Sequence, residues 1–95
     1  LMGKMNSQAG RLIVEDVFKM NAGGCVVVGS VQGVLAAGQK VMVHDRKDRS
    51  IQTKICGIEI HRKKTKVAAN TPAALYFKDI AYDKIHKGDI ICSME

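Results

Sequence analysis

Short apolar clusters rich in β-branched residues recur along the 95-residue chain, separated by turns that contain glycine or many charges. This pattern predicts strands, because none of the clusters leads into a sustained amphipathic helix. The six predicted strands are Arg11–Met20, Cys25–Val31, Lys40–Asp45, Ser50–His61, Ala73–Lys78 and Asp89–Met94. We expect a small all-β fold, a closed or nearly closed antiparallel barrel of six to seven strands, because closure removes exposed strand edges.

The longest predicted strand changes its apolar face part-way along. Apolar residues occupy odd-numbered positions up to Ile55 and even-numbered positions from Ile58. A strand cannot change face without an extra residue or a kink. We therefore predict a glycine bulge at Gly57, where the strand bends around a barrel corner and directs Glu59 and His61 outward.

The segment 33–41, GVLAAGQKV, has two glycines five positions apart, as a nucleotide-binding phosphate loop does. Such a loop needs G-x-x-x-x-G-K-[ST], but Gln39 takes the place of the lysine and Val41 that of the hydroxyl residue. A strand follows, whereas a phosphate loop opens a helix. Gly33 and Gly38 are therefore predicted to be turn glycines around a short connecting strand.

The segment 78–89 is the one helical candidate, and its apolar residues do not form an amphipathic stripe. We expect a loop with about one helical turn, packing Ile80 and Ile85 beneath the end of the barrel. Residues 1–10 are expected to be a disordered leader or a remnant of cloning, so that the barrel domain spans 11–95. No apolar run approaches the roughly 20 residues that cross a bilayer, so we expect no membrane partner and a cytoplasmic protein.

Cysteine and histidine are too scattered to predict a disulfide framework or a metal site. They stand singly at Cys25, Cys56, Cys92, His44, His61 and His86. We expect all three cysteines to be small buried hydrophobes in a reducing compartment. Paired carboxylates and nucleophile–base sets are not visible, so we predict no enzyme, no catalytic residue and no cofactor.

Positive charge is concentrated in the middle of the chain. The net charge is +6, and residues 44–66 hold eight lysines and arginines against three acidic residues. One basic cluster, Arg46, Lys47 and Arg49, alternates with aspartates in a predicted hairpin tip, and we interpret it as a solvated secondary patch. The other cluster is the run RKKTK, residues 62–66, which is predicted to be a loop and has no acidic residue within it. It is predicted to contact nucleic-acid phosphates, at the opposite end of the long strand from the first cluster.

Six short motifs stand in a fixed order over about eighty residues. They are Val14–Phe18, Gly24–Gly29, Gly33–Gly38, Val41–Val43, Gly57–Lys63 and Lys87–Ile91. In this order the chain resembles the second domain, domain II, of translational GTPases, and most closely that of elongation factor Tu. The resemblance implies a small β-barrel, as a stand-alone or excised copy without the GTPase domain. The motifs of GTP hydrolysis are absent from the sequence, so GTPase activity is not expected.

In elongation factor Tu this barrel helps to hold the aminoacylated 3′ end of tRNA, around the segment that matches Gly57–Lys63. The resemblance therefore implies RNA contact by Glu59, His61, Arg62, Lys63, Lys64 and Lys66. The family has an aromatic residue where His61 stands, and imidazole can also stack on a base. A second family glutamate aligns near Asn70–Thr71, where this chain has no carboxylate.

Two functions are compatible with these observations. The first is a non-catalytic barrel that binds RNA (tRNA or ribosomal RNA), but not DNA, through the basic run. The alternative is a protein-interaction module that docks a GTPase domain or self-associates without nucleic acid. That alternative requires an exposed apolar patch, which we would expect near Val26–Val28 or Ile58–Ile60.

Overall fold

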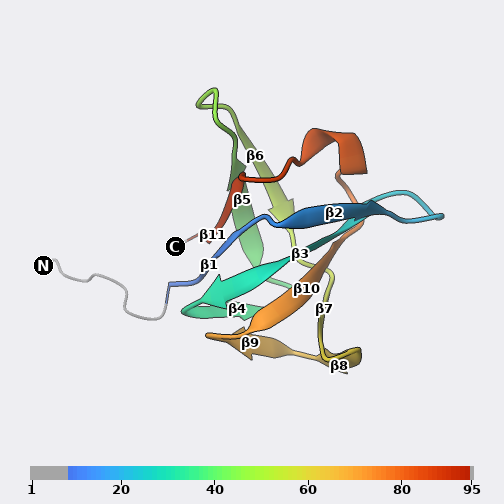
Figure 1. Ribbon diagram of the computed structural model, residues 1–95, viewed down its shortest axis with the longest axis vertical. Helices are drawn as coiled ribbons and strands as arrows, with labels where there is room; N and C mark the ends of the chain where they lie inside the picture. Colours follow the sequence, from blue (N-terminus) through green and yellow to red (C-terminus); the bar gives the residue numbers. More distant parts are fainter. Residues whose placement is uncertain (1–8, 95) are drawn as a thin grey trace, which may run out of the picture.

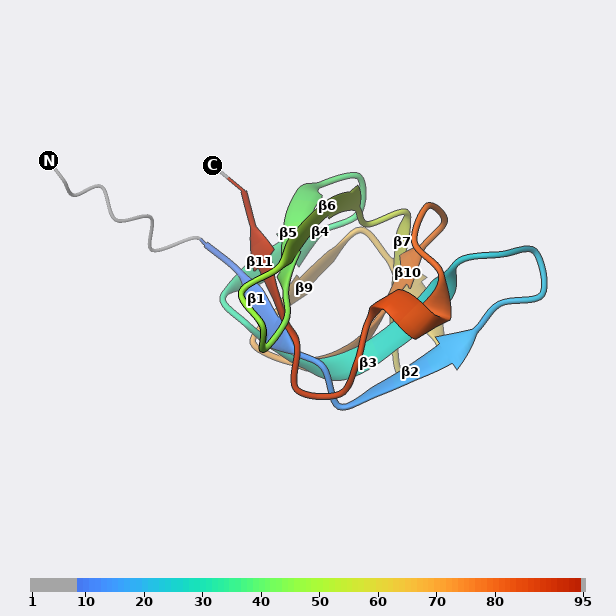
Figure 2. The ribbon, with the colours of Figure 1, turned by 90° about the horizontal axis from the view of Figure 1, so that it is seen from above.

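Short strands, most of which alternate buried and exposed side chains, form the wall of a small barrel (Figures 1 and 2). The computed structural model describes residues 9–94. The elements are β1 (Arg11–Ile13), β2 (Asp16–Lys19), β3 (Cys25–Gln32), β4 (Val34–Ala36), β5 (Lys40–His44), β6 (Ser50–Lys54), β7 (Gly57–Ile60), β8 (Lys63–Thr65), β9 (Val67–Ala69), β10 (Pro72–Phe77), the 3₁₀ helix η1 (Tyr82–Lys84) and β11 (Ile90–Ser93). The strand pairs are antiparallel, which confirms the predicted all-β fold class.

One long sheet wraps around the core in the order β6-β5-β11-β1-β3-β10-β7-β8, and β2 joins it by pairing with β3. Strand β3 is long enough to pair with β1 at one end, with β2 at the other, and with β10 along its opposite edge. The segment 50–60 contributes both β6 and β7, which lie near the two ends of the sheet. This one segment therefore closes the wall. Strands β4 and β9 form a separate two-stranded sheet.

The closing segment turns a corner at Ile55 and Cys56, between β6 and β7. The amide of Gly38 donates a hydrogen bond to the carbonyl of Ile55 at 2.7 Å. On the other side, the amide of Cys56 donates to the carbonyl of Tyr76 at 2.8 Å. The corner is thus hydrogen-bonded both to the segment before β5 and to β10, so its backbone groups stay paired while the chain changes direction.

The predicted change of face is confirmed, because Ile55 and Ile58 are both buried although they differ in parity. The predicted bulge at Gly57 is wrong. Gly57 is the first residue of β7 and pairs with Tyr76, and the two residues before it make the break by leaving the ladder. The predicted strand 50–61 is consequently two strands, and the predicted strand 11–20 is likewise divided into β1 and β2.

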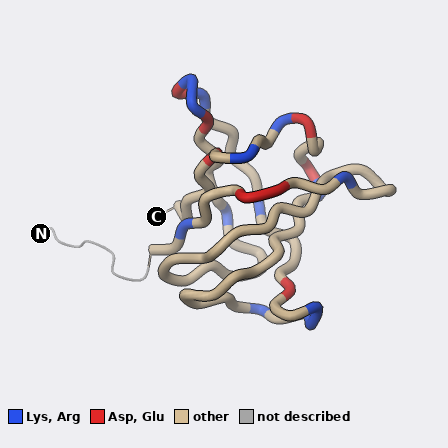
Figure 3. Tube along the Cα trace, viewed as in Figure 1, with Lys and Arg blue, Asp and Glu red and all other residues tan. Residues whose placement is uncertain are grey.

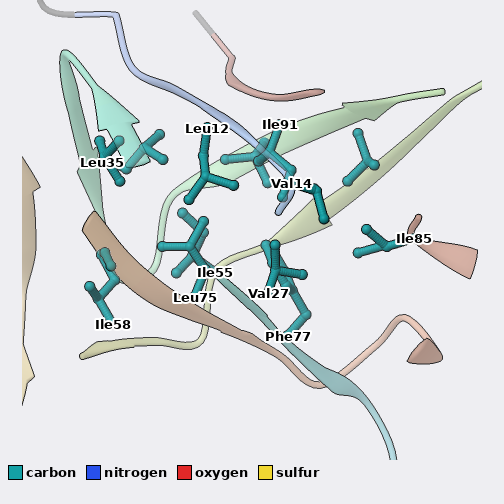
Figure 4. Close-up of a cluster of buried hydrophobic side chains, with 14 of the residues drawn as sticks. Leu12, Val14, Val27, Leu35, Ile55, Ile58, Leu75, Phe77, Ile85 and Ile91 are labelled. Atoms are coloured by element: carbon teal, nitrogen blue, oxygen red, sulfur yellow. The ribbon is translucent and has the colours of Figure 1, made fainter. Parts of the chain in front are cut away.

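The core fills the inside of the barrel with aliphatic side chains and one aromatic ring, Phe77 (Figure 4). Figure 4 shows these side chains converging from strands on different sides of the barrel. Ile80 and Ile85 are 5% and 2% exposed, and η1 lies between them, which confirms their predicted packing beneath the barrel end. Burial of each such side chain stabilises the fold by about 1.5–3 kcal/mol before conformational entropy is subtracted.

Gly33 and Gly38 flank the short strand β4, as predicted, and have φ angles of 75° and 89°. Side chains with a Cβ atom rarely adopt these angles, which accounts for glycine at both turns. The amide of Gly33 donates to Oδ1 of Asn70 at 2.8 Å, and the amide of Asn70 donates to the carbonyl of Gly33 at 3.0 Å. The turns at both ends of the β4–β9 pair are therefore fixed by turn chemistry, without a phosphate site.

Three features differ from the prediction or fall outside it. The predicted loop at RKKTK is wrong, because Lys63–Thr65 forms β8.

The predicted burial of all three cysteines is also wrong. Cys25 is buried, but Cys56 is exposed because it sits on the outside of the barrel corner. Burial, and secondarily the nearby Cys56, raises the pKa of the Cys25 thiol to about 11. Of the expected leader, residues 1–8 lie outside the described residues, and Gly10 donates a hydrogen bond to Oγ of Ser93.

None of the helices in residues 9–94 is both long and apolar enough to cross a membrane. The described residues also contain no cluster of three or more histidine, cysteine, aspartate or glutamate side chains that could hold a metal ion.

Two glycines on the barrel wall should differ in how much stability they lose on substitution by alanine. A Cβ at Gly29 would lie 2.5 Å from the carbonyl oxygen of Ile13 and 2.9 Å from Leu12, whereas a Cβ at Gly57 would meet only Tyr76, at 3.8 Å. We expect Gly29→Ala to lower the free energy of unfolding by about 2 kcal/mol, because overpacking displaces β1. Gly57→Ala should change it by less than about 0.5 kcal/mol. Urea denaturation measures both, and equal losses would restore a bulge role for Gly57.

A second stability test concerns Thr53, which points into the core from β6. The hydroxyl of Thr53 is buried and has no hydrogen-bond partner among the described residues. Replacing an unsatisfied buried hydroxyl with a methyl group removes its desolvation cost, so Thr53→Val should raise the free energy of unfolding by about 1 kcal/mol. Thr65→Val is the matched control, because the Thr65 hydroxyl donates to the carbonyl of Val67 and should show no gain. A loss at Thr53 would indicate a hydrogen-bonded water inside the barrel.

Candidate nucleic-acid interface

The residues predicted to contact RNA lie on and beside the β7–β8 hairpin, which projects at the end of the barrel away from the β5–β6 tip (Figure 1). Glu59 pairs with Lys64 across the hairpin, and Ile60 pairs with Lys63. His61 and Arg62 therefore form the two-residue loop that connects β7 to β8. A hairpin of this length requires a turn with the right-handed twist of its strands, which type I′ supplies with positive φ at both central residues.

The turn adopts that conformation with an unusual pair of residues. His61 has a φ of 53° and Arg62 a φ of 67°. Type I′ turns favour Asn-Gly, because a residue with a longer side chain is strained in the left-handed region. Holding a non-glycine residue there costs on the order of 1 kcal/mol. The sequence therefore places a cation and an imidazole at the tip at the expense of turn stability.

The four cations of the basic run are exposed but do not share one face. Lys64 lies opposite Glu59 on the outward face of the sheet, and Lys63 lies opposite Ile60 on the other face. Arg62 occupies the tip. Lys66 follows β8, where its carbonyl accepts a hydrogen bond from Ala37 at 2.9 Å. None of the four forms an ion pair within 4.0 Å with another part of the described chain.

Two grooves flank the hairpin, and Glu59 lines both. One groove, of about 290 Å³, lies between the turn and strands β3 and β10 and is also lined by Glu15, His61 and Arg62. The other, of about 420 Å³, lies on the β8 side and is lined by Lys64 and Tyr76 among others. Each groove therefore brings a cation, a carboxylate and a ring together in a concave site.

Tyr76 and Glu59 are neighbours on the outward face. Tyr76 lies opposite Gly57 and Glu59 opposite Ala74, which makes them diagonal partners on β10 and β7. Partial burial raises the pKa of the Tyr76 phenol above its usual value, and the carboxylate of Glu59, as hydrogen-bond acceptor and negative charge, raises it further. The phenol therefore stays protonated near neutral pH and can donate a hydrogen bond.

None of the known protein-family models matches the sequence. Among solved structures, the chain is similar to translation elongation factor SelB from Methanococcus maripaludis, both in complex with the GTP analogue GppNHp and in the apo form. Each comparison gives a TM-score of 0.78 at 20% sequence identity, covering 90% of this chain and 19% of the SelB chain. The chain has the fold of a translation-factor β-barrel domain. At this identity the likeness concerns the fold, and it spans about a fifth of SelB.

The secondary patch, Arg46, Lys47 and Arg49, lies at the opposite end of the barrel from the β7–β8 hairpin (Figure 3). Asp45 accepts hydrogen bonds from the amides of Lys47 and Arg49 and from Nε of Arg49, at 2.8, 3.0 and 2.8 Å. These bonds, first among them the one from the Arg49 amide, lower the pKa of Asp45. Arg49 is thus a hairpin-stabilising residue, while the guanidinium of Arg46 packs against Gly88.

Sequence reasoning missed two residues of the grooves. Tyr76 stands between Leu75 and Phe77, both buried, so strict alternation would have directed it outward. Glu15 lies in the break between β1 and β2, and no sequence signal marked that break. Glu15 adds a second carboxylate to Glu59 in one groove, whereas Asn70, near which the family alignment lacks a carboxylate, holds a turn.

The strained turn gives a direct test. The double substitution His61→Asn and Arg62→Gly should raise the free energy of unfolding by about 1 kcal/mol, because both residues then suit positive φ. Thermal and urea denaturation would measure the gain. The control is Asp48→Asn, at a position of positive φ whose residue already tolerates that conformation, and it should change the free energy of unfolding little. A loss of stability in the double variant would mean that His61 or Arg62 makes a stabilising contact.

Proposed function

We propose that this chain is a non-catalytic RNA-binding barrel of the translation-factor type, which contacts tRNA or ribosomal RNA through the β7–β8 hairpin. The observation that carries the proposal is the hairpin itself. Its strained turn presents His61 and Arg62 at an exposed tip, and its lysines have no acidic partner within 4.0 Å among the described residues. Cations free of such partners can release the counterions of a phosphate backbone, which supplies affinity without sequence readout.

The grooves beside the hairpin favour RNA over a simple polyanion. Glu15 and Glu59 repel phosphate, but they accept hydrogen bonds from base amino groups and ribose hydroxyls. His61 lines one groove and Tyr76 the other, and both offer a ring for an unpaired base. Phosphates would then lie toward Arg62, Lys63, Lys64 and Lys66, with a nucleoside in a groove. The 2′-hydroxyl is the group that separates RNA from DNA here.

The similarity to SelB supports a place in translation without transferring SelB's ligands. The SelB structure was determined with a GTP analogue, whereas this chain lacks the phosphate-loop, base-recognition and D-x-x-G motifs of a GTPase. GTP hydrolysis is therefore not part of the proposal. A cytoplasmic location follows from the proposed partner, since tRNA and ribosomes are found there.

Protein docking is the second candidate, and one surface favours it. Phe18 on β2 is 51% exposed and Tyr82 on η1 is 46% exposed. The ammonium of Lys19 lies 5.8 Å from the centre of the Tyr82 ring. Exposed aromatic residues beside a cation are typical of protein interfaces, and a GTPase domain or a second copy of the chain could occupy them. At the two places where an apolar patch was expected, Ile58 is buried at 1% exposure, and Ile60, Val26 and Val28 are half-buried.

Charge reversal on the hairpin tests the RNA proposal. We expect Lys63→Glu with Lys64→Glu to abolish retention of RNA, because the phosphate contacts become repulsive. The variant should fold, since both side chains are exposed, with a small drop in melting temperature because Lys64→Glu places a carboxylate opposite Glu59. Fluorescence anisotropy with labelled deacylated tRNA, aminoacylated tRNA and a ribosomal RNA fragment would be measured over a salt series.

The control is Lys78→Glu with Lys84→Glu, which changes the net charge equally at exposed sites away from both grooves. It should weaken binding only slightly. RNA binding that survives the hairpin reversal would refute the hairpin as the site. If the wild-type chain does not bind RNA at low salt and its mass by light scattering rises with concentration, the docking candidate replaces the RNA proposal.

A further inference from the structure

A second positively charged surface lies on the barrel wall, away from both hairpin tips. It consists of the outward face of β6, β5, β11 and β1, which are neighbours in that order in the sheet. The polar residues that define this wall surface are Lys54, Gln52, Lys40, His44, Ser50 and Arg11. In Figure 3, blue segments on β1, β5 and β6 lie between the two basic tips.

The register brings two of these lysines together. Lys40 on β5 lies directly opposite Lys54 on β6, and both side chains are exposed. Directly opposed residues have Cβ atoms about 5 Å apart, and like charges in this arrangement destabilise a sheet. Neither ammonium has a carboxylate within 4.0 Å among the described residues. An anion between them would remove the repulsion.

The remaining outward positions add a third cation and no acidic residue. Arg11 on β1 lies opposite Cys92, which in turn lies opposite Met42 in the row next to the lysine pair. At about 4.8 Å per strand and 3.4 Å per residue, Arg11 is on the order of 12 Å from Lys40. The outward rows on the other half of the barrel differ, because Asp16 and Glu59 occupy them. Charge is therefore separated between the two halves of the wall.

We propose that this wall surface is a second RNA-contacting site, which binds backbone phosphates with Lys40, Lys54 and Arg11. The proposal rests on the proposed function for its choice of partner, but it uses none of the hairpin residues. The lysine pair binds one phosphate, and Arg11 binds another further along the strand. RNA that leaves the hairpin grooves would thus remain in contact with the barrel wall.

The chemistry of the surface favours RNA over an acidic protein. His44 and Ser50 are joined by a 2.8 Å hydrogen bond between Nδ1 and Oγ, and with Gln52 they offer further hydrogen-bonding groups, as phosphate and ribose contacts require. The apolar residues at the centre of the surface, Met42 and Ile90, are half-buried in the wall, while Ile13 opposite Ile90 is 41% exposed. One exposed aliphatic side chain is a small part of the apolar centre on which a protein interface depends. His44 is the one exposed ring among the outward residues of these strands, so contact is mainly with the backbone rather than with stacked bases.

The test is Lys40→Glu with Lys54→Glu, measured by anisotropy with labelled oligouridylate and labelled tRNA over a salt series. Loss of the one single-strand phosphate contact made by the lysine pair should reduce the slope of log K against log salt by about 0.7. It should also weaken binding by roughly 5-fold at 0.1 M salt. Lys40→Arg with Lys54→Arg should retain the wild-type slope, because the charges persist. Thermal melts would show that each variant is folded.

Lys19→Glu with Lys84→Glu, at two exposed sites on β2 and η1, is the matched control for net charge. If the wall variant binds RNA as tightly as this control, the wall surface is not a phosphate site and the proposal is overturned. The hairpin variant separates the two proposals. Loss of binding at the hairpin with a normal wall variant leaves the proposed function intact and rejects the wall site. Loss of binding in the wall variant with normal binding in the hairpin variant supports the wall site and rejects the hairpin as the RNA site. Absence of RNA binding by the wild-type chain rejects both proposals.

Discussion

A single backbone corner, at Ile55 and Cys56, determines how the barrel is assembled. The segment that contains it contributes β6, near one end of the sheet, and β7, near the other. The two strands need opposite parity to bury their apolar residues, so the corner must move the chain by one residue. Hydrogen bonds from Gly38 and to Tyr76 hold it from both sides. Because the segment 50–60 is short, it holds the two ends of the sheet close together, and the sheet between them must curve.

The corner also decides which residues are available for function. Before it, even-numbered positions such as Lys54 face outward, and after it odd-numbered positions such as Glu59 do. Without the shift, Glu59 would point into the core and Ile58 would face water. The carboxylate in both grooves is thus a consequence of barrel closure. The same shift allows one chain segment to contribute to a basic wall surface and, a few residues later, to a mixed-charge groove.

Much of the fold could be predicted, because alternation of side chains is a local property. The six strand segments, the turn glycines and the burial of Ile80 and Ile85 all follow from it. The position of the corner could not be predicted, since glycine was the only local signal for a bend and the actual break is made by pairing with distant segments. Exposure of Cys56 was missed for the same reason. Of the candidate site, the hairpin residues could be named from their order, but Glu15 and Tyr76 join them only through the tertiary structure.

Local sequence preference and observed conformation agree at most of the turns, which makes the exception informative. Apart from glycine, four described residues have positive φ, and two of them are Asp48 and Asn70. Asp and Asn tolerate the left-handed region better than most residues other than glycine, so these two turns need no further explanation. The turn at His61 and Arg62 has no residue that favours positive φ, although Asn-Gly would form the same hairpin with less strain. A local rule broken at an exposed tip, in a barrel that otherwise obeys such rules, is expected where side-chain chemistry has been retained over stability.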